Sequence, residues 1–222
     1  MNAPSVAFRK RILYQAMLLG GFSTLATAML VAGNIATRGA ILERQQEDLL
    51  SSLNQVVPAA HYDNNLLDYP LRLPGRSGKM LTVYRGTRGM QISSLAYEIF
   101  GQGYGGEIRL ILGLDAAGRI LGVRVLAHAE TPGLGDKIEV EKSSWILQFN
   151  GLSLDHPPQR EWKVTKDGGR FDAFSGATIT PRAVLQAIEV GLLFHREHYT
   201  ELHNPPAIFN ASVASDEAPK HE

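Results

Sequence analysis

The longest hydrophobic pattern of the chain is an uncharged run near its N-terminus. Residues 12–37 contain no charged side chain, and a helix needs roughly 20 mostly apolar residues to cross a bilayer. The run therefore predicts a transmembrane helix over residues 12–37. The small residues at 26–28 also resemble a signal-peptide cleavage site. A signal-peptide core has only roughly 7–15 residues, so the length of the run favours a retained anchor over a cleaved signal.

The segment after the span, residues 38–79, is predicted to form a juxtamembrane helix and a loop. Apolar residues recur at near-helical spacing between residues 41 and 57. Pro58 disfavours a helical conformation in the residue before it, so the helix is expected to end there. Residues 61–79 are rich in Pro, Gly and Asn, which are typical of loops.

Residues 80–203 are predicted to form an outer domain with strands and helices. β-Branched and apolar runs predict a strand over 80–86 and a hairpin over 107–130, and the segment 93–106 is a short apolar stretch entering a glycine-rich turn. Helical spacing predicts helices over 137–154 and 181–203. A strand with a turn at Gly168–Gly169 is expected between them, over 161–174. Because the elements do not alternate as regular βαβ units, the fold class is α+β.

The polar tail, residues 204–222, is rich in Pro and Ala and is predicted to be flexible. Charge gives the orientation of the span: Arg9, Lys10 and Arg11 directly precede it. Since basic residues flank the cytoplasmic side of membrane helices, residues 1–11 are predicted to be cytoplasmic and everything after the span to lie outside.

The overall composition excludes several classes of function. Lys and Arg number 22 and are balanced by 22 Asp and Glu, and no basic run is interleaved with aromatics, so nothing favours a nucleic-acid partner. Cysteine is absent, which excludes disulfides, a cysteine nucleophile and iron–sulfur ligation by thiolates. No metal site is expected. If the protein moves electrons, an organic cofactor must carry them.

One glycine motif is a false lead. The stretch "GQGYGG" places Gly101, Gly103 and Gly106 in the G-x-G-x-x-G pattern of dinucleotide-binding folds. That fingerprint requires a preceding strand and a following helix. Here the residues that follow, 107–114, have a strand pattern, so a Rossmann fold is not predicted.

Three hydroxyl residues lie close together in the stretch "FDAFSGATIT", namely Ser175, Thr178 and Thr180. Thr180 directly precedes Pro181, and a threonine N-cap followed by a proline is a helix-start signature. A helix is therefore predicted to begin at Pro181, with Thr180 as its cap. On this reading the other two hydroxyls simply belong to the turn.

The same stretch also has features of an anion site. The N-terminus of a helix offers free N–H groups and a positive dipole end that suits a phosphate. Gly176 and Ala177 allow close approach to the backbone, and Arg182 adds a nearby cation. Taken alone, the stretch leaves the anion site and the simple capped turn equally open.

A second unusual stretch, "HAETPGLGDK", follows the predicted hairpin. Its Pro and Gly residues make a shaped loop, and Glu130 and Thr131 are polar residues at a strand end, where binding sites often lie. The alternative is an ordinary strand-ending loop with a solvated Glu130. Neither stretch decides the function by itself.

Together, "ETPGLG" (130–135) and "DAFSGAT" (172–178) resemble the FMN-binding domain with covalent flavin attachment. That domain occurs in the G subunit of the Rnf electron-transport complex and in the C subunit of the sodium-pumping NADH:quinone reductase. The attachment signature of the family is matched here, and the resemblance covers the whole chain. The "SGATIT" stretch and the neutral, short tail fit the Rnf protein better than its quinone-reductase relative, whose chain is usually longer. The matching residues are Asp172, Ser175, Gly176, Ala177 and Thr178.

The resemblance implies that Thr178 carries FMN through a phosphoester to its side-chain oxygen. A separate flavin transferase makes this bond in the family, and Asp172 belongs to the sequence which that enzyme recognises. Ser175 and Gly176 would shape the turn, with Thr180 as the helix cap. No catalytic residue is expected in the chain itself.

The resemblance also implies contacts to the flavin ring. Glu130 and Thr131 are expected at its polar edge, Leu134 over one face, and Lys137 near the reduced, anionic ring. Tyr104 in the glycine turn is a further candidate. For Lys137 and Tyr104, ordinary surface exposure and packing are the alternative, because lysine is usually exposed and tyrosine often half-buried.

The implied function is that of an electron-carrier subunit in a membrane-bound, ion-translocating oxidoreductase complex of the ferredoxin- and NAD-linked Rnf type. Its partners would be the other membrane, iron–sulfur and flavin subunits, the flavin transferase and membrane lipid, and no activity is expected of the chain alone. The outer domain would be periplasmic, anchored in a bacterial inner membrane. The alternatives are a flavoprotein of another assembly and a non-redox periplasmic scaffold or binding module.

Overall fold

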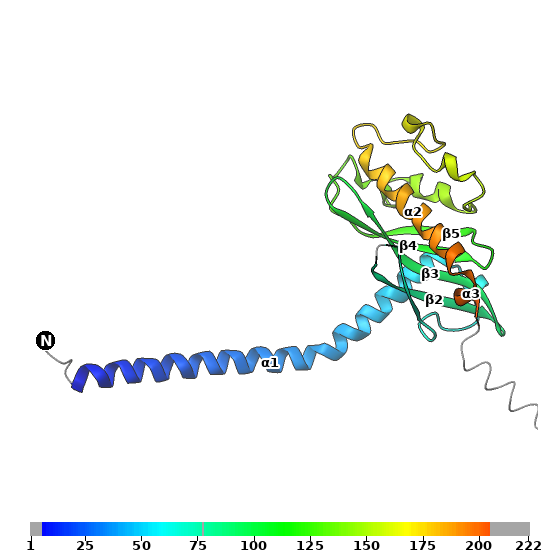
Figure 1. Cartoon of the computed structure of the whole chain (residues 1–222). Coiled ribbons are helices and arrows are strands. Elements are labelled where there is room, and N and C mark those ends of the chain that lie inside the picture. The colour runs from blue at the N-terminus through cyan, green and yellow to red at the C-terminus, as the bar shows by residue number, and fades with distance from the viewer. Residues whose placement is uncertain (1–5, 77, 205–222) are drawn as a thin grey trace, which may run out of the picture. The chain divides into compact units, whose positions relative to one another are not determined.

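The computed structural model describes residues 6–76 and 78–204 (Figure 1). They divide into two compact units, one up to Asp48 and one from Leu49 onward. The first unit is the greater part of helix α1 (Val6–Val56). The second contains a five-stranded sheet and its covering elements. Residues 1–5 of the predicted cytoplasmic segment and residues 205–222 of the predicted tail lie outside the described residues.

Helix α1 contains the predicted span. Among the described residues it is the one helix long and apolar enough to cross a membrane, and an 18-residue stretch of it has a mean hydropathy of 1.7. The hydroxyls of Thr24, Thr27 and Thr37 each donate to a carbonyl one turn earlier, at 2.8 Å, so these polar groups are satisfied within the helix. The helices predicted for 12–37 and 41–57 are one continuous helix, because Gly39 is the one poor helix former between them and a single glycine does not end a helix.

The sheet is antiparallel throughout and has the strand order β1-β2-β3-β4-β5. Its longest strand, over 91–102, replaces the short apolar stretch predicted from the sequence, and a short edge strand lies within the predicted loop 61–79. The predicted hairpin is confirmed by the pairing of the last two strands. The strands are β1 (Leu71–Pro74), β2 (Met80–Arg88), β3 (Gln91–Gln102), β4 (Glu107–Asp115) and β5 (Ile120–Ala127).

The two faces of the sheet bury different elements. On β3, Leu95, Tyr97 and Ile99 belong to the main core, whereas Ala96 belongs to a smaller core on the opposite face. This alternation is the period of two expected of a strand buried on both sides. Helix α2 (Ile179–Glu197) lies across the strands on the main-core face (Figure 1). The smaller core contains the last turn of α1, through Leu53 and Val56.

Helix α2 is the helix predicted from residue 181 onward, with corrected ends. It begins at Ile179 and ends at Glu197, and a five-residue helix α3 (Tyr199–His203) follows after His198. The Tyr97 hydroxyl donates to the carbonyl of Gly191 at 2.9 Å, which joins α2 to the middle of the sheet.

The region between β5 and α2 contradicts the sequence-based prediction. Residues 137–154 do not form the predicted α-helix, and residues 161–174 do not form the predicted strand; both are irregular, with short 3-10 helices. Their shape comes instead from a buried cluster of aromatic rings whose centroids lie 5.0–6.2 Å apart. The 3-10 helices are Asp136–Ile138, Ser144–Phe149, Gln159–Glu161 and Thr165–Asp167, with a further one at Ala59–His61. The clustered rings are Trp145, Phe149, Trp162, Phe171 and Phe174.

Candidate functional site

A cleft of about 480 Å³ opens at the N-terminal end of α2. Three segments far apart in the sequence form it: the turn between β3 and β4, the loop after β5, and the turn that leads into α2. The glycine-rich stretch "GQGYGG" is the first of these, and it joins two antiparallel strands rather than a strand and a helix. The rejection of a dinucleotide fold is therefore confirmed.

Glu130 is the residue that connects these three segments. Its side chain is buried, with only 5% of the residue exposed. Oε1 accepts a hydrogen bond from the backbone N–H of Gly105 at 2.9 Å, and Oε2 accepts one from the hydroxyl of Thr180. The carboxylate thus joins the loop after β5 to both the β3–β4 turn and the first turn of α2. Each of its two oxygens has a partner within the protein, and Glu130 also lines the cleft, so its contact with a flavin edge stays a prediction.

The loop after β5 passes close to this carboxylate. A β-carbon on Gly135 would lie 2.8 Å from both Glu130 Oε2 and Thr180 Oγ1. Such contacts are too short for any side chain, so glycine is required at this close approach. The backbone N–H groups of Leu134 and Gly135 both donate to the Thr131 carbonyl at 3.1 Å, which closes the loop into a tight turn along the cleft.

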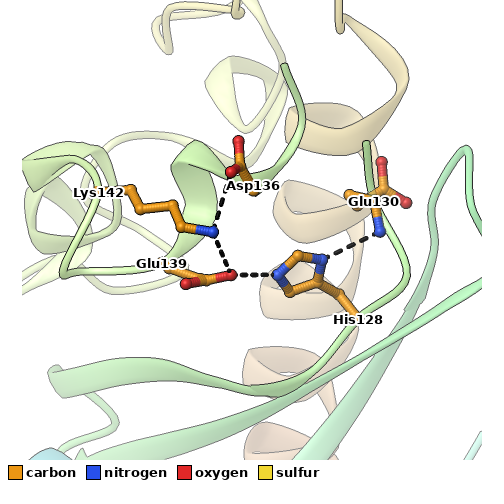
Figure 2. A network of polar contacts seen from close by, with 5 residues as sticks. All are labelled: His128, Glu130, Asp136, Glu139 and Lys142. Carbon is orange, nitrogen blue, oxygen red and sulfur yellow. Dashed lines mark hydrogen bonds and ion pairs between the residues drawn. The ribbon is translucent and has the colours of Figure 1, made fainter. Parts of the chain in front are cut away.

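A polar network connects the Glu130 backbone to the side chains of His128, Glu139, Lys142 and Asp136 (Figure 2). The Glu130 N–H donates to His128 Nδ1 at 3.0 Å, and His128 Nε2 lies 2.6 Å from Glu139 Oε1. Lys142 Nζ lies 3.1 Å from the same Glu139 oxygen and 2.9 Å from Asp136 Oδ2. The contact with His128, followed by that with Lys142, lowers the pKa of the Glu139 carboxyl. The carboxylates of Asp136, with the larger effect, and of Glu139 raise the pKa of Lys142.

The third segment, the turn into α2, is exposed at its tip and anchored from behind. The Ala177 N–H donates to the Phe174 carbonyl at 3.2 Å, and Gly176 between them has a φ of 82°. That left-handed conformation favours glycine. Trp145 supports the base of the turn, because its Nε1–H donates to the Asp172 carbonyl at 2.8 Å and its ring packs edge-on against Phe174.

The two threonines at the start of α2 have different surroundings. Thr178 is the N-cap residue by position, but its hydroxyl makes no capping bond and instead lies 3.3 Å from Lys166 Nζ. Thr180 is buried in the first turn and donates to Glu130. The prediction that Thr180 caps the helix is therefore wrong. Arg182 is ion-paired with Asp167 at 2.6 Å, so Lys166 rather than Arg182 is the cation beside Thr178.

Comparison with known proteins places this cleft in a family. The family model of the FMN-binding domain matches residues 103–192. The G subunit of the ion-translocating oxidoreductase complex of Cereibacter sphaeroides is 47% identical over 204 residues, covering 92% of this chain and 93% of that protein. The chain belongs to this family of G subunits. The corresponding protein of Stutzerimonas stutzeri is 44% identical over 197 residues, covering 89% of this chain and 86% of that protein.

A solved structure was also found to be similar, the crystal structure of Shewanella oneidensis NqrC. It is 21% identical to this chain, with a TM-score of 0.43, over 68% of this chain and 73% of NqrC. The location of the family match is more informative. Residues 103–192 include every residue that lines the cleft, so the part of the chain that matches the FMN-binding domain is the part that builds the cleft.

The cleft brings together most of the residues predicted for the site. Ser175 and Lys137 are exposed and are not among the described residues that line it, so the predicted contact of Lys137 with the flavin has no support from the cleft geometry. Asp172 is exposed behind the turn. The predicted residues that line the cleft are Tyr104, Glu130, Thr131, Leu134, Gly176, Ala177, Thr178 and Thr180.

Sequence reasoning missed three residues of this site. Gly135 is the last residue of the "ETPGLG" motif, so its membership of that motif was the sequence signal for its place in the site. Ile179 lines the cleft at the first position of α2. It was missed because the helix was predicted to start two residues later, at Pro181. Lys166 lies in a segment predicted as a strand, so no sequence signal connected it to Thr178. Among the described residues, no group of three His, Asp or Glu side chains could hold a metal ion.

Proposed function

We propose that this chain carries FMN covalently on Thr178, through a phosphoester to its side-chain oxygen, and relays electrons within an ion-translocating oxidoreductase complex. The match to the FMN-binding domain and the membership of the family of G subunits support the cofactor and the electron-carrier role. When bound, FMN can accept one or two electrons, and the protein supplies its position and electrostatic environment.

The observation that carries the proposal is the difference between the two threonines at the start of α2. The Thr180 hydroxyl is buried and bonded to Glu130. The Thr178 hydroxyl lies on the wall of the cleft, with Lys166 at 3.3 Å. A phosphodiester at Thr178 would keep one negative charge beside this ammonium group and the N-terminus of α2, and both favour an anion.

The residues of the cleft suit a flavin. Its volume of about 480 Å³ lies in the range of roughly 300–1,000 Å³ that is typical of small-molecule and cofactor sites. Leu134, Tyr104 and Ile179 line it and are 43%, 74% and 46% exposed, so they offer apolar surface to a planar ring. Thr131, from the loop after β5, also lines the cleft, and its hydroxyl is a further hydrogen-bonding group of the site.

The proposed location follows from the N-terminal charges and the family. Arg9, Lys10 and Arg11 before the span favour a cytoplasmic N-terminus, so the cleft would lie on the periplasmic side of a bacterial inner membrane. The other subunits of the complex and membrane lipid would contact the span. A flavin transferase would make the phosphoester, with Asp172 in the exposed sequence that it recognises.

The test is the intact mass of the full chain, expressed with and without a flavin transferase. We expect one added flavin mononucleotide unit in the presence of the transferase, mapped to Thr178 by peptide sequencing, and fluorescence of the band that survives denaturing electrophoresis. A chain that gains no flavin beside an active transferase, or that gains it at another residue, would refute the proposal and favour a scaffold or binding role.

A further inference from the structure

Glu130 is held by hydrogen bonds of both its side chain and its backbone. The side chain bonds to Gly105 and Thr180, and the backbone N–H donates to His128 Nδ1 at 3.0 Å. His128 and Glu130 are separated by one residue at the point where the chain leaves β5. The imidazole therefore helps to position the main chain of Glu130, from which the side chain reaches the other two segments of the cleft.

This hydrogen bond determines the tautomer of His128. A backbone N–H can only donate, so Nδ1 must be unprotonated and act as the acceptor. The neutral ring then carries its hydrogen on Nε2, which faces Glu139 Oε1 at 2.6 Å. The Glu139 carboxylate can only accept, so it selects this tautomer. Lys142 in turn holds Glu139 in place, as Figure 2 shows.

We propose that His128 is a positioning residue of the flavin cleft, which acts through the Glu130 backbone and is held in its tautomer by Glu139. This inference rests on the proposed function, because it assigns His128 a role toward the flavin on Thr178. Neither His128 nor Glu139 is among the described residues that line the cleft. Their effect is transmitted through contacts.

The contacts of Glu130 reach both walls of the cleft. On one side, Glu130 is continuous with the loop that carries Thr131 and Leu134, so a displaced backbone at Glu130 would shift these residues against the ring. On the other side, the Glu130 carboxylate holds Thr180, two residues beyond Thr178 on the same helix start. Loss of the His128 acceptor is therefore expected to loosen the grip on the flavin without removing any group that touches it.

Three substitutions at His128 separate this role from simple packing. The side-chain oxygen of His128→Asn can occupy the place of Nδ1 and accept from the Glu130 N–H. His128→Gln places its amide near Nε2 and leaves Nδ1 without a substitute. His128→Ala removes both. The full chain is expressed with a flavin transferase, and His61→Asn, in the turn after α1 and away from the cleft, is the matched control.

Two measurements are made on each variant: the visible circular dichroism of the attached flavin, and the extent of attachment under limiting transferase. We expect His128→Ala and His128→Gln to lose attachment by about five- to tenfold, the factor for one buried hydrogen bond, and to lose most of the flavin dichroism. His128→Asn should restore both toward the wild-type values. The thermal unfolding midpoint is recorded for every variant, so that the flavin signal refers to folded protein.

The inference is overturned if His128→Gln restores the flavin signals as well as His128→Asn does, or if the alanine variant keeps the wild-type dichroism. If the alanine variant does not fold, the comparison of the asparagine and glutamine variants still decides. A wild-type chain without any flavin would overturn the proposed function together with this inference, whereas a flavin-bearing wild type with equal asparagine and glutamine variants would overturn the inference alone.

Discussion

The cleft has two walls that differ in how firmly the protein holds them. The Glu130–Gly135 loop is tied to two other segments by a buried carboxylate, and Gly135 leaves no room for a side chain between them. The turn 175–178 has exposed residues at its tip, and its Thr178 hydroxyl lies 3.3 Å from the Nζ of the exposed Lys166. The Glu130–Gly135 wall is therefore held rigidly, and the wall formed by the turn 175–178 is accessible to solvent.

This difference suits a residue that another enzyme must modify. If Thr178 carries the flavin as proposed, a transferase would have to reach its hydroxyl, and an exposed turn allows this. The shape of the finished site would then depend on the opposite wall, where Glu130 is already hydrogen-bonded within the protein. Buried polar groups that are fully hydrogen-bonded give a rigid arrangement. Substitutions on each wall can test whether flavin attachment depends on the turn 175–178 and the rigidity of the site on the Glu130–Gly135 loop.

The largest effect is expected from Thr178→Ala, which should abolish covalent flavin. The fold should persist, because the hydroxyl makes no capping bond, and the free energy of unfolding should change by less than about 0.5 kcal/mol. The measurements are in-gel flavin fluorescence and denaturant unfolding, with Thr178→Ser as the variant that keeps a hydroxyl. Denaturation-resistant flavin on the alanine variant would contradict the assignment of Thr178 as the acceptor.

The next largest effect is expected from Glu130→Ala, on the other wall. It should lower the free energy of unfolding by about 2 kcal/mol, because the Gly105 N–H and the Thr180 hydroxyl lose their acceptor. Glu130→Gln keeps an oxygen for Gly105 and should cost less. Chemical denaturation measures both variants. If the alanine variant is as stable as the wild type, the carboxylate does not hold the wall.

A smaller effect on stability is expected from Thr180→Ala. It should cost about 1 kcal/mol, because one buried carboxylate oxygen of Glu130 loses its donor, while most of the flavin stays attached to Thr178. Thr180→Ser, which keeps the hydroxyl, serves as the control. A Thr180→Ala chain that folds normally but carries no flavin would show that the two walls are not separable in this way.

The smallest effect is expected from Lys166→Ala. The rate of flavin attachment should fall by about two- to threefold, since an exposed charge contributes little, and the difference should shrink as salt is raised. Lys166→Arg keeps the charge and should attach flavin at close to the wild-type rate. Attachment is followed over time by flavin fluorescence. An alanine variant that is equally fast at low salt would remove Lys166 from the site.

Elements with a clear period were predictable from the sequence. The span, the hairpin of β4 and β5, and α2 all have apolar residues at the spacing of their structure, and each was found. The strand β3 was underestimated because its C-terminal end runs into glycines, which are usually signals of turns. The sheet tolerates them because Gly101 pairs with Ile108 in a regular ladder.

The segment between β5 and α2 shows where periodicity fails. Ile138, Trp145, Ile146 and Phe149 have helical spacing and are inward-facing, yet they lie in two short 3-10 helices joined by irregular backbone rather than in one α-helix. Phe149, for example, packs against a ring as distant in sequence as Phe171. A local pattern cannot distinguish a helix from an irregular chain that is shaped by such contacts, because both place apolar residues toward a core.

The candidate site was predictable where motifs carried it and not where long-range contacts did. The two motifs, their flanking residues and the glycine turn predicted most of the residues that line the cleft. The role of Thr180 was predicted wrongly, because a threonine before a proline is a strong local signal for a cap, whereas its actual acceptor, Glu130, lies 50 positions earlier in the chain. Rules based on neighbouring residues cannot predict a hydrogen-bond partner that is distant in sequence and close only in the folded protein.

The aromatic cluster behind the turn 175–178 has an optical consequence. It contains both tryptophans of the chain, Trp145 and Trp162, and the indole of Trp145 is bonded to the base of the turn. Tryptophan emission overlaps flavin absorption, so excitation energy passes from an indole to a flavin nearby. If FMN is attached to Thr178 as proposed, the protein contains its own spectroscopic reporter: its ultraviolet-excited emission is expected to dim as the cofactor is attached, with no dye or label introduced.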